Sequence, residues 1–310
     1  MNEIFLNIKK VEKQKLIDVL FYLARDPIPT RCMNVTLPGR KKNTLYEADD
    51  FIEQKLQFYG YNIEKESVSI QVFQPDASVK HGFRKPLPNE QWYDAFNFYA
   101  QKKGNQNPEE LIILISHKDT QSWLGIAPGA YDNGVGVAAN LEMARILVDY
   151  KSRCSIWFLF CNEEHWPWTS VQAAQNIANS NYKVVAVLNI DGIGGKSVED
   201  KLNGKMMNVT RYVKPEGENI ADLISIINEE YKIGLDQTKY KSDKPNDDDG
   251  SFINAGIHAA VMNIGSYPFA DPSYHTKNDA PENVDLENVK LTTQLILATV
   301  LHIDRFGIKY

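Results

Sequence analysis

Side chains with metal-binding or acid–base chemistry follow three short apolar runs of this sequence. They are, in chain order, His117 and Asp119 after Leu111–Ser116, Glu163 and Glu164 after Ser155–Cys161, and Asp191 after Val184–Ile190. Buried strands of a parallel sheet have this apolar composition, and ligands bind where the carboxyl ends of such strands meet. We therefore expect these five side chains to share one crevice.

Two further segments add polar groups to the same set. A Gly-rich turn, Gly129–Gly136, presents Asp132 between the first two strands, and His275 stands in a polar loop before the last helix. Taken alone, each residue also has a purely structural interpretation as a helix cap, a turn residue or a hydrogen-bonded histidine. These interpretations weaken together, because several carboxylates in one crevice repel one another unless cations are present.

The types of ligand indicate which cation. Imidazole and carboxylate without thiolate suit zinc, with manganese or cobalt as substitutes. Some hydrolases hold two ions about 3.5–4 Å apart. If Asp132 bridges, the ligands are His117, Asp132 and Asp191 for one ion, and Asp132, Glu164 and His275 for the other. Three protein ligands leave room for water, so the sequence predicts a catalytic site with two Zn²⁺ ions, or with one.

The remaining acidic groups have separate predicted roles. Adjacent Glu163 and Glu164 point in different directions, so that one can bind metal while the other stays free as the general base. Asp119 comes two residues after His117 and is placed to accept its second ring N–H, which fixes the tautomer.

The elements that must position these groups alternate along the chain. Amphipathic helices are expected at 10–25, 47–59, 134–150, 170–179, 218–231 and 286–306, and strands at 67–73, 111–116, 155–161, 184–190 and 259–264. Residues 74–91 are rich in Pro and charge and are expected to form a loop. The pattern predicts a single α/β domain, in which the helices and strand of residues 1–91 pack on a motif-bearing core of residues 92–310.

The charge, the apolar runs and the cysteines of the sequence limit which binding partners and which cell compartment are expected. The 310 residues include 34 Lys and Arg against 40 Asp and Glu, a net charge of −6 that argues against nucleic acid and anionic membranes. There is no apolar run of about 18 residues and no secretory pattern at the amino terminus, which favours a cytoplasmic protein. Three distant cysteines, Cys32, Cys154 and Cys161, form neither a disulfide framework nor a zinc-binding pair.

Five separated motifs resemble the pattern of the zinc aminopeptidase family M28, from about residue 92 to residue 306. They are His117-Lys-Asp119, Gly129-Ala-Tyr-Asp132-Asn-Gly-Val-Gly136, Glu163-Glu164, Asn189-Ile-Asp191-Gly and Tyr274-His275-Thr-Lys-Asn-Asp279. The resemblance implies a three-layer α/β/α sandwich with a mixed, mostly parallel central sheet. It also implies metal ligands at His117, Asp132, Glu164, Asp191 and His275, with Glu163 as general base.

The sequence departs from that family pattern at two places. The Glu pair is followed by His165-Trp-Pro-Trp-Thr-Ser170 instead of Gly-Leu-x-Gly-Ser, which predicts a bulkier wall beside the base. Asp249 stands where the family often has a histidine, in Asp247-Asp248-Asp249-Gly-Ser-Phe252. If that histidine stabilises the oxyanion, then Tyr267, His258 or the metal must replace it here.

Three functions are consistent with the sequence. The leading prediction is a metal-dependent aminopeptidase that acts on peptides or small aminoacyl substrates. The first alternative is a glutaminyl cyclase with one zinc, since such enzymes share several of these motifs and the stretch from Pro268 to His275 resembles theirs. The intact Asp132-Asn133-Gly134 turn favours the peptidase. A non-catalytic binding module is the second alternative, although Glu163 and every predicted ligand are present.

Overall fold

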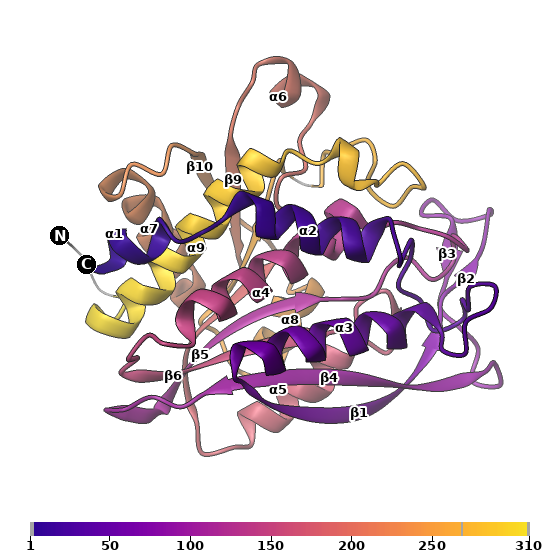
Figure 1. Cartoon of the computed structure of the whole chain (residues 1–310), viewed down its shortest axis with the longest axis horizontal. Helices are drawn as coiled ribbons and strands as arrows, with labels where there is room; N and C mark the ends of the chain where they lie inside the picture. The colour runs from indigo at the N-terminus through magenta and orange to yellow at the C-terminus, as the bar shows by residue number, and fades with distance from the viewer. Residues whose placement is uncertain (1–2, 268, 309–310) are drawn as a thin grey trace.

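A nine-stranded sheet organises the computed structural model, which describes residues 3–267 and 269–308 (Figure 1). The strands of the described residues are β1 (Asn62–Val72), β2 (Gln74–Pro75), β3 (Phe83–Arg84), β4 (Trp92–Lys102), β5 (Asn107–His117), β6 (Cys154–Cys161), β7 (His165–Trp166), β8 (Lys183–Ile190), β9 (Met207–Tyr212), β10 (Asp236–Lys241) and β11 (Ala260–Ile264). The sheet has the order β10-β9-β11-β8-β5-β6-β4-β1-β7, and β2 pairs with β3 outside it.

The sheet is mixed, as the sequence predicted. In its centre, β5 runs parallel to both β6 and β8, and β11 runs parallel to β8. On one side β4 and β1 join antiparallel, and on the other β9 is antiparallel to β11. The antiparallel share is larger than predicted, because β1 from the amino-terminal part and the unpredicted strands β4 and β9 all pair antiparallel with a neighbour.

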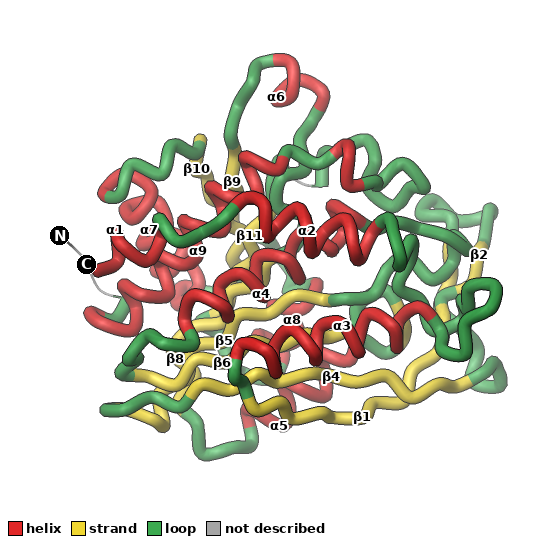
Figure 2. The backbone as a smooth tube through the Cα atoms, viewed as in Figure 1, coloured by secondary structure: helices red, strands yellow, loops and turns green. Residues whose placement is uncertain are grey.

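Helices cover both faces of this sheet (Figures 1 and 2). In the described residues they are α1 (Glu3–Ile8), α2 (Lys13–Ala24), α3 (Thr44–Tyr59), α4 (Val135–Leu147), α5 (Thr169–Ala178), α6 (Val198–Leu202), α7 (Pro215–Glu230), α8 (Asp247–Asn254) and α9 (Leu286–Phe306), with the short turns η1 (Ala130–Gly134) and η2 (Pro281–Asn283). One face carries α1–α4, α7 and α9, and the other carries α5 and α8. The result is the predicted three-layer sandwich.

The side chains of β5 alternate between the two faces of the sheet, so its single apolar run packs against the helix layers on both sides. Ile112 and Leu114 pack into the large cluster under α2, α4 and α9, whereas Leu111, Ile113 and Ile115 pack into the smaller cluster under α5 and α8. Successive side chains of a strand point to opposite faces, so a strand covered on both sides is apolar throughout. The amino-terminal helices α1–α3 bury their apolar faces in the same large cluster as α4 and α9.

The sequence did not predict β4, which is largely buried, or β9, which is buried throughout; the other missed elements are short or polar. β10 (DQTKYK) lies at an edge of the sheet and has no buried residue, so it carries no apolar run. α8 begins with three aspartates, which hid its helical pattern. No helix of residues 3–267 and 269–308 is long and apolar enough to cross a bilayer. All three cysteines are buried and unpaired.

Candidate metal centre

The candidate metal centre lies where three adjacent strands end. β5 stands between β6 and β8 and is parallel to both, so the chain leaves all three strands at the same edge of the sheet. His117 is the last residue of β5, and Asp191 directly follows β8. Glu163 and Glu164 come just after β6, which ends at Cys161. The order of the strands therefore brings together the side chains that follow the three apolar runs.

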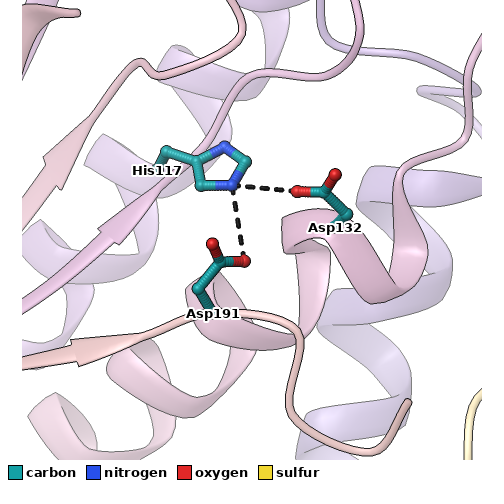
Figure 3. A group of neighbouring side chains, drawn as sticks. All are labelled: His117, Asp132 and Asp191. Carbon is teal, nitrogen blue, oxygen red and sulfur yellow. Dashed lines mark ion pairs between the residues drawn. The ribbon is translucent and has the colours of Figure 1, made fainter. Parts of the chain in front are cut away.

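A first group consists of His117, Asp132 and Asp191 (Figure 3). The His117 Nε2 atom lies 3.0 Å from Asp132 Oδ1 and 3.5 Å from Asp191 Oδ1. All three residues are buried, and they come from β5, from η1 and from the end of β8. Their ligand atoms face one another within 4.8 Å, which is a compact arrangement for one ion.

A second group consists of Asp132, Glu164 and His275. The His275 Nε2 atom lies 3.1 Å from Asp132 Oδ2 and 3.2 Å from Glu164 Oε1. The two oxygens of Asp132 thus face different imidazoles, Oδ1 towards His117 and Oδ2 towards His275. This is the geometry expected of a carboxylate that bridges two cations.

Aromatic side chains hold the His275 imidazole in place. The ring stacks on Tyr274 with centroids 3.9 Å apart, and Trp123 meets it edge-on at 5.2 Å. The backbone of His275 has a positive φ of 55°, which is uncommon for a residue other than glycine, and its side chain faces Asp132. His275 is the one predicted ligand that does not come from a strand end or from η1, and it depends on this local packing.

The turn that presents Asp132 is fixed by two side chains. Asn133 donates from Nδ2 to the Ile190 carbonyl (2.8 Å) and accepts from the backbone N–H of Gly136 (2.9 Å), which joins the turn to the end of β8. Asp279 accepts from the backbone N–H groups of Tyr131 (2.7 Å) and Asp132 (3.0 Å). The late Asp279 of the sequence motif therefore acts on Asp132 through the backbone.

Asp119 connects several parts of the centre. Its Oδ1 accepts from His117 Nδ1 (3.2 Å) and from the Glu163 N–H (2.9 Å). Its Oδ2 accepts from the Glu164 N–H (2.8 Å) and from His165 Nδ1 (2.7 Å). Burial opposes ionisation, but the hydrogen bonds from His117 and His165 outweigh it and lower the pKa of Asp119. The predicted partner of His117 thus also fixes the backbone of the Glu pair.

The ionisation of the protein groups reflects their crowding. Burial disfavours a charged imidazole, yet Glu164 and Asp132 raise the pKa of His275 to about 10. The same balance, with burial opposed mainly by Asp191, raises the pKa of His117 well above its ordinary value. Burial raises the pKa of Asp191 to about 7, although His117 favours its carboxylate form. Without cations the centre therefore keeps protons on both imidazoles.

These residues fit divalent cations. Among the described residues, Asp132, Glu164 and Asp191 form ion pairs only with histidines. Asp191 Oδ1 is buried and has no hydrogen-bond partner within the described parts of the chain. Imidazole nitrogens and carboxylate oxygens, without a thiolate, are the donors that zinc sites of hydrolases use.

The sequence profile of Peptidase family M28 matches residues 97–300, which include every residue of the two groups. The chain belongs to peptidase family M28. A "Probable zinc metalloprotease" of Pyrenophora teres f. teres (strain 0-1) is 34% identical over 107 residues, 33% of this chain and 23% of that protein. "Aminopeptidase YwaD" of Bacillus subtilis (strain 168) is 27% identical over 212 residues, 64% of this chain and 42% of that protein. The M28 chain thus spans about a quarter to two fifths of these curated relatives.

Solved structures share the fold of this M28 chain at low sequence identity. A zinc aminopeptidase from Bacillus subtilis superposes with a TM-score of 0.73 at 14% identity, covering 94% of this chain and 95% of that chain. A glutaminyl cyclase from Bacteroides thetaiotaomicron superposes with a TM-score of 0.71 at 15% identity, covering 94% of this chain and 97% of that chain. At such identities the likeness shows the fold alone.

Glu163 stands in the wall of the same cavity and belongs to neither group of candidate ligands. Burial, together with the nearby Asp248 and Asp247 carboxylates, raises the pKa of Glu163 well above its ordinary value. Its Oε2 atom is buried and has no hydrogen-bond partner in the described chain. Glu163 therefore offers a basic oxygen beside the candidate ligands.

The M28 centre opens into a cavity of about 790 Å³. Its apolar wall is formed by Phe73, Phe83, Trp166, Pro167, Trp168, Val171 and Tyr274. Trp166 and Trp168 belong to the segment in which the sequence departs from the family pattern, and the structure places both beside the candidate centre. Phe73 and Phe83 come from the amino-terminal part, which therefore contributes to the rim of the cavity.

The second departure from the M28 pattern points away from the cavity. Asp249 is buried and pairs with Arg211 at 2.6 Å, whereas Asp247, which also pairs with Arg211, lines the cavity. Of the replacement donors suggested by the sequence, neither Tyr267 nor His258 lines the cavity. Tyr267 packs on Tyr240, and His258 lies on the surface near Glu216. Pro268 lies outside the described residues.

Sequence reasoning missed one side chain that contacts the candidate ligands directly. Gln121 is fully buried, and its Nε2 atom lies 2.6 Å from Asp132 Oδ2 and 3.1 Å from Glu164 Oε1. It follows β5 in an irregular segment, where no periodic pattern indicates which side chains point inward. The only available signal was its position four residues after His117.

Proposed function

We propose that this chain is a metal-dependent exopeptidase, an aminopeptidase with two Zn²⁺ ions. The observation that carries the proposal is that Asp132 faces His117 with one oxygen and His275 with the other, at 3.0 and 3.1 Å. His117, Asp132 and Asp191 would hold one ion, and Asp132, Glu164 and His275 the other. The names of the curated relatives, a probable zinc metalloprotease and an aminopeptidase, support the same activity.

The ions would polarise the scissile carbonyl and acidify a water molecule in the cavity. Glu163 takes the proton from the attacking water on its free Oε2 and returns it to the leaving amine. Asp119 holds the Glu163 N–H and the His117 ring, so the base and a ligand are positioned by one carboxylate. The aromatic wall excludes water from the reacting bond and binds apolar parts of the substrate.

The carboxylates of the cavity favour a substrate with a positively charged end. Of the cavity carboxylates, Glu163 and Asp247 belong to neither candidate metal group and so are not neutralised by the ions, although Arg211 pairs with Asp247 and Lys85 also lines the cavity. A free α-ammonium group is attracted to such a site, whereas an acetylated amino terminus carries no charge. This argues for an aminopeptidase rather than an endopeptidase, and it makes N-acetylated substrates the natural negative control.

A glutaminyl cyclase remains the second candidate, because a solved cyclase superposes with a TM-score of 0.71. A cyclase that uses one zinc needs only one of the two candidate groups. The second group, and the Asn133 that ties the turn to β8, favour the peptidase. The two candidates therefore differ in metal content as well as in reaction.

One experiment separates these functions. Metal bound per chain is measured by mass spectrometry, next to hydrolysis of aminoacyl anilides, their N-acetylated forms, and cyclisation of a peptide with amino-terminal Gln. We expect about two zinc ions and release of aniline from the free-amine substrates only, abolished by a chelator. One ion with cyclisation and no hydrolysis would establish the cyclase instead. A protein that takes up no metal would refute both functions.

A further inference from the structure

Gln121 is placed like a ligand of the second ion. The candidate atoms of that group are His275 Nε2, Asp132 Oδ2 and Glu164 Oε1. The Gln121 amide lies 2.6 Å from that Asp132 oxygen and 3.1 Å from that Glu164 oxygen. It therefore approaches the same two oxygens that His275 faces.

The segment around Gln121 is rigid enough to hold this position. The backbone carbonyl of Gln121 accepts from the Leu124 N–H (3.3 Å), and the neighbouring Ser122 hydroxyl donates to the Glu164 carbonyl (2.7 Å). The Gln121 side chain is 0% exposed, so it has no solvent to turn into. The amide must therefore stay beside the two carboxylates whether or not a cation is present.

The orientation of the amide depends on what lies between those carboxylates. With protein groups alone, Nε2 donates to both oxygens, and Oε1 is buried without a hydrogen-bond partner in the described residues. Amide nitrogen and oxygen have nearly the same shape and exchange places by a half-turn of the group. A cation held by the carboxylates repels the N–H groups and attracts the carbonyl oxygen.

We propose that Gln121 is a fourth protein ligand of the second ion, bound through Oε1 after its amide turns. This inference rests on the proposed two-ion centre and deepens it. In the metal-free protein the amide N–H groups hold Asp132 and Glu164 together, and metal binding replaces these hydrogen bonds by a bond to oxygen. Amide oxygens are established ligands of divalent cations.

The two ions then differ in how the protein holds them. The first has three protein ligands, His117, Asp132 and Asp191, which leaves it the more open coordination. The second has Asp132, Glu164, His275 and Gln121, a set of four that approaches the closed count of structural zinc sites. We expect the second ion to be retained more firmly than three ligands would allow.

The test is zinc binding by metal-free protein, measured by calorimetry with a competing chelator. The variants are Gln121→Met, which keeps the length but removes the oxygen, and Gln121→Glu, which supplies a charged oxygen. Gln57→Met, on the exposed face of α3, is the matched control. His275→Ala identifies which of the two binding events belongs to the second group.

We expect Gln121→Met to weaken the second binding event by at least about tenfold and to leave the first unchanged. Gln121→Glu is expected to bind the second ion as tightly as the wild type or more tightly, and Gln57→Met to match the wild type. If Gln121→Met binds the second zinc ion as tightly as the wild type or more tightly, the proposal is overturned. The Gln121 amide would then either not contact the ion or oppose its binding. If the wild-type protein binds only one ion, the proposal for Gln121 is also overturned. Whether the wild-type protein hydrolyses free-amine substrates is measured separately, and that result decides the proposed aminopeptidase function.

Discussion

Replacing Glu163 with Gln tests the mechanism most directly. The change keeps the shape of the side chain and removes its ability to accept a proton. Because Glu163 is in neither candidate metal group, we expect Glu163→Gln to bind the same amount of zinc as the wild type. The buried Oε2 without a partner marks Glu163 as an acid–base group and not as part of a structural ion pair.

The magnitude follows from the role of Glu163. General acid–base catalysis by one positioned side chain contributes about 100-fold to 10,000-fold, or about 2.7 to 5.4 kcal/mol of barrier. The expected loss in kcat therefore lies in that range, with little change in KM. In metal-free protein we expect the variant to gain stability while it loses activity. Burial and the Asp248 and Asp247 carboxylates raise the pKa of Glu163. At pH values above the ordinary pKa of a glutamate, the wild-type fold is therefore destabilised by the cost of ionising Glu163. A neutral Gln removes that penalty at neutral pH.

The assay combines turnover of an aminoacyl anilide, zinc content and thermal unfolding of metal-free protein at pH 7.5. Glu110→Gln is the matched control, since Glu110 lies on β5 and pairs with the exposed Lys183. Glu163→Gln should lose most turnover while it keeps its zinc and a melting temperature at or above that of the wild type. Turnover above about a tenth of the wild-type rate would refute the role of Glu163 as base. Loss of zinc would show that it is a ligand.

Three more predictions concern metal and stability. Asp132→Ala should abolish binding of both ions, because one oxygen faces each imidazole; a variant that keeps one ion at wild-type affinity contradicts the bridge. Zinc uptake at pH 7 should release protons, since the pKa of His275 is raised to about 10 and the metal needs neutral imidazole. The affinity for zinc should therefore rise with pH through neutrality. Calorimetry in buffers of different ionisation enthalpy measures the protons released, and finding no proton release would refute this prediction. Arg31→Met should lower the free energy of unfolding by at least about 3 kcal/mol in urea titrations, because several buried carbonyls lose a charged donor, whereas Arg25→Met at an exposed position should not.

The sequence predicted the layered fold because its central strands are apolar on both faces. β5, β6, β8 and β11 are nearly continuous apolar runs, and such runs are typical of strands covered by two layers. The alternating pattern at residues 67–73 predicted only the second half of β1, because its first half has no buried residue, and β10 has no buried residue at all and was not predicted. Whether a polar segment forms an edge strand depends on its pairing with the adjacent strand more than on its own composition.

The candidate ligands were predictable for a related reason. The ends of β5, β6 and β8 fix where His117, Glu164 and Asp191 lie, and the sequence states which residue follows each strand. Gln121 was not predictable, since its direction depends on an irregular segment after β5. Asp249 was noticed as a departure, but only the structure shows that Arg211 from β9 turns it away from the cavity.

The amino-terminal part carries no recognisable motif, yet it supports the centre from behind. Arg31 is fully buried and donates to the carbonyls of Lys118 (2.7 Å), Leu23 (2.6 Å), Pro128 (2.8 Å) and Gly129 (2.7 Å). Two of these carbonyls immediately precede η1, and one lies between His117 and Asp119. One guanidinium therefore contacts both the turn that presents Asp132 and the loop that directly follows His117. Because a catalytic centre must hold its groups to within a fraction of an ångström, we expect the amino-terminal part to be required for the activity proposed for this centre.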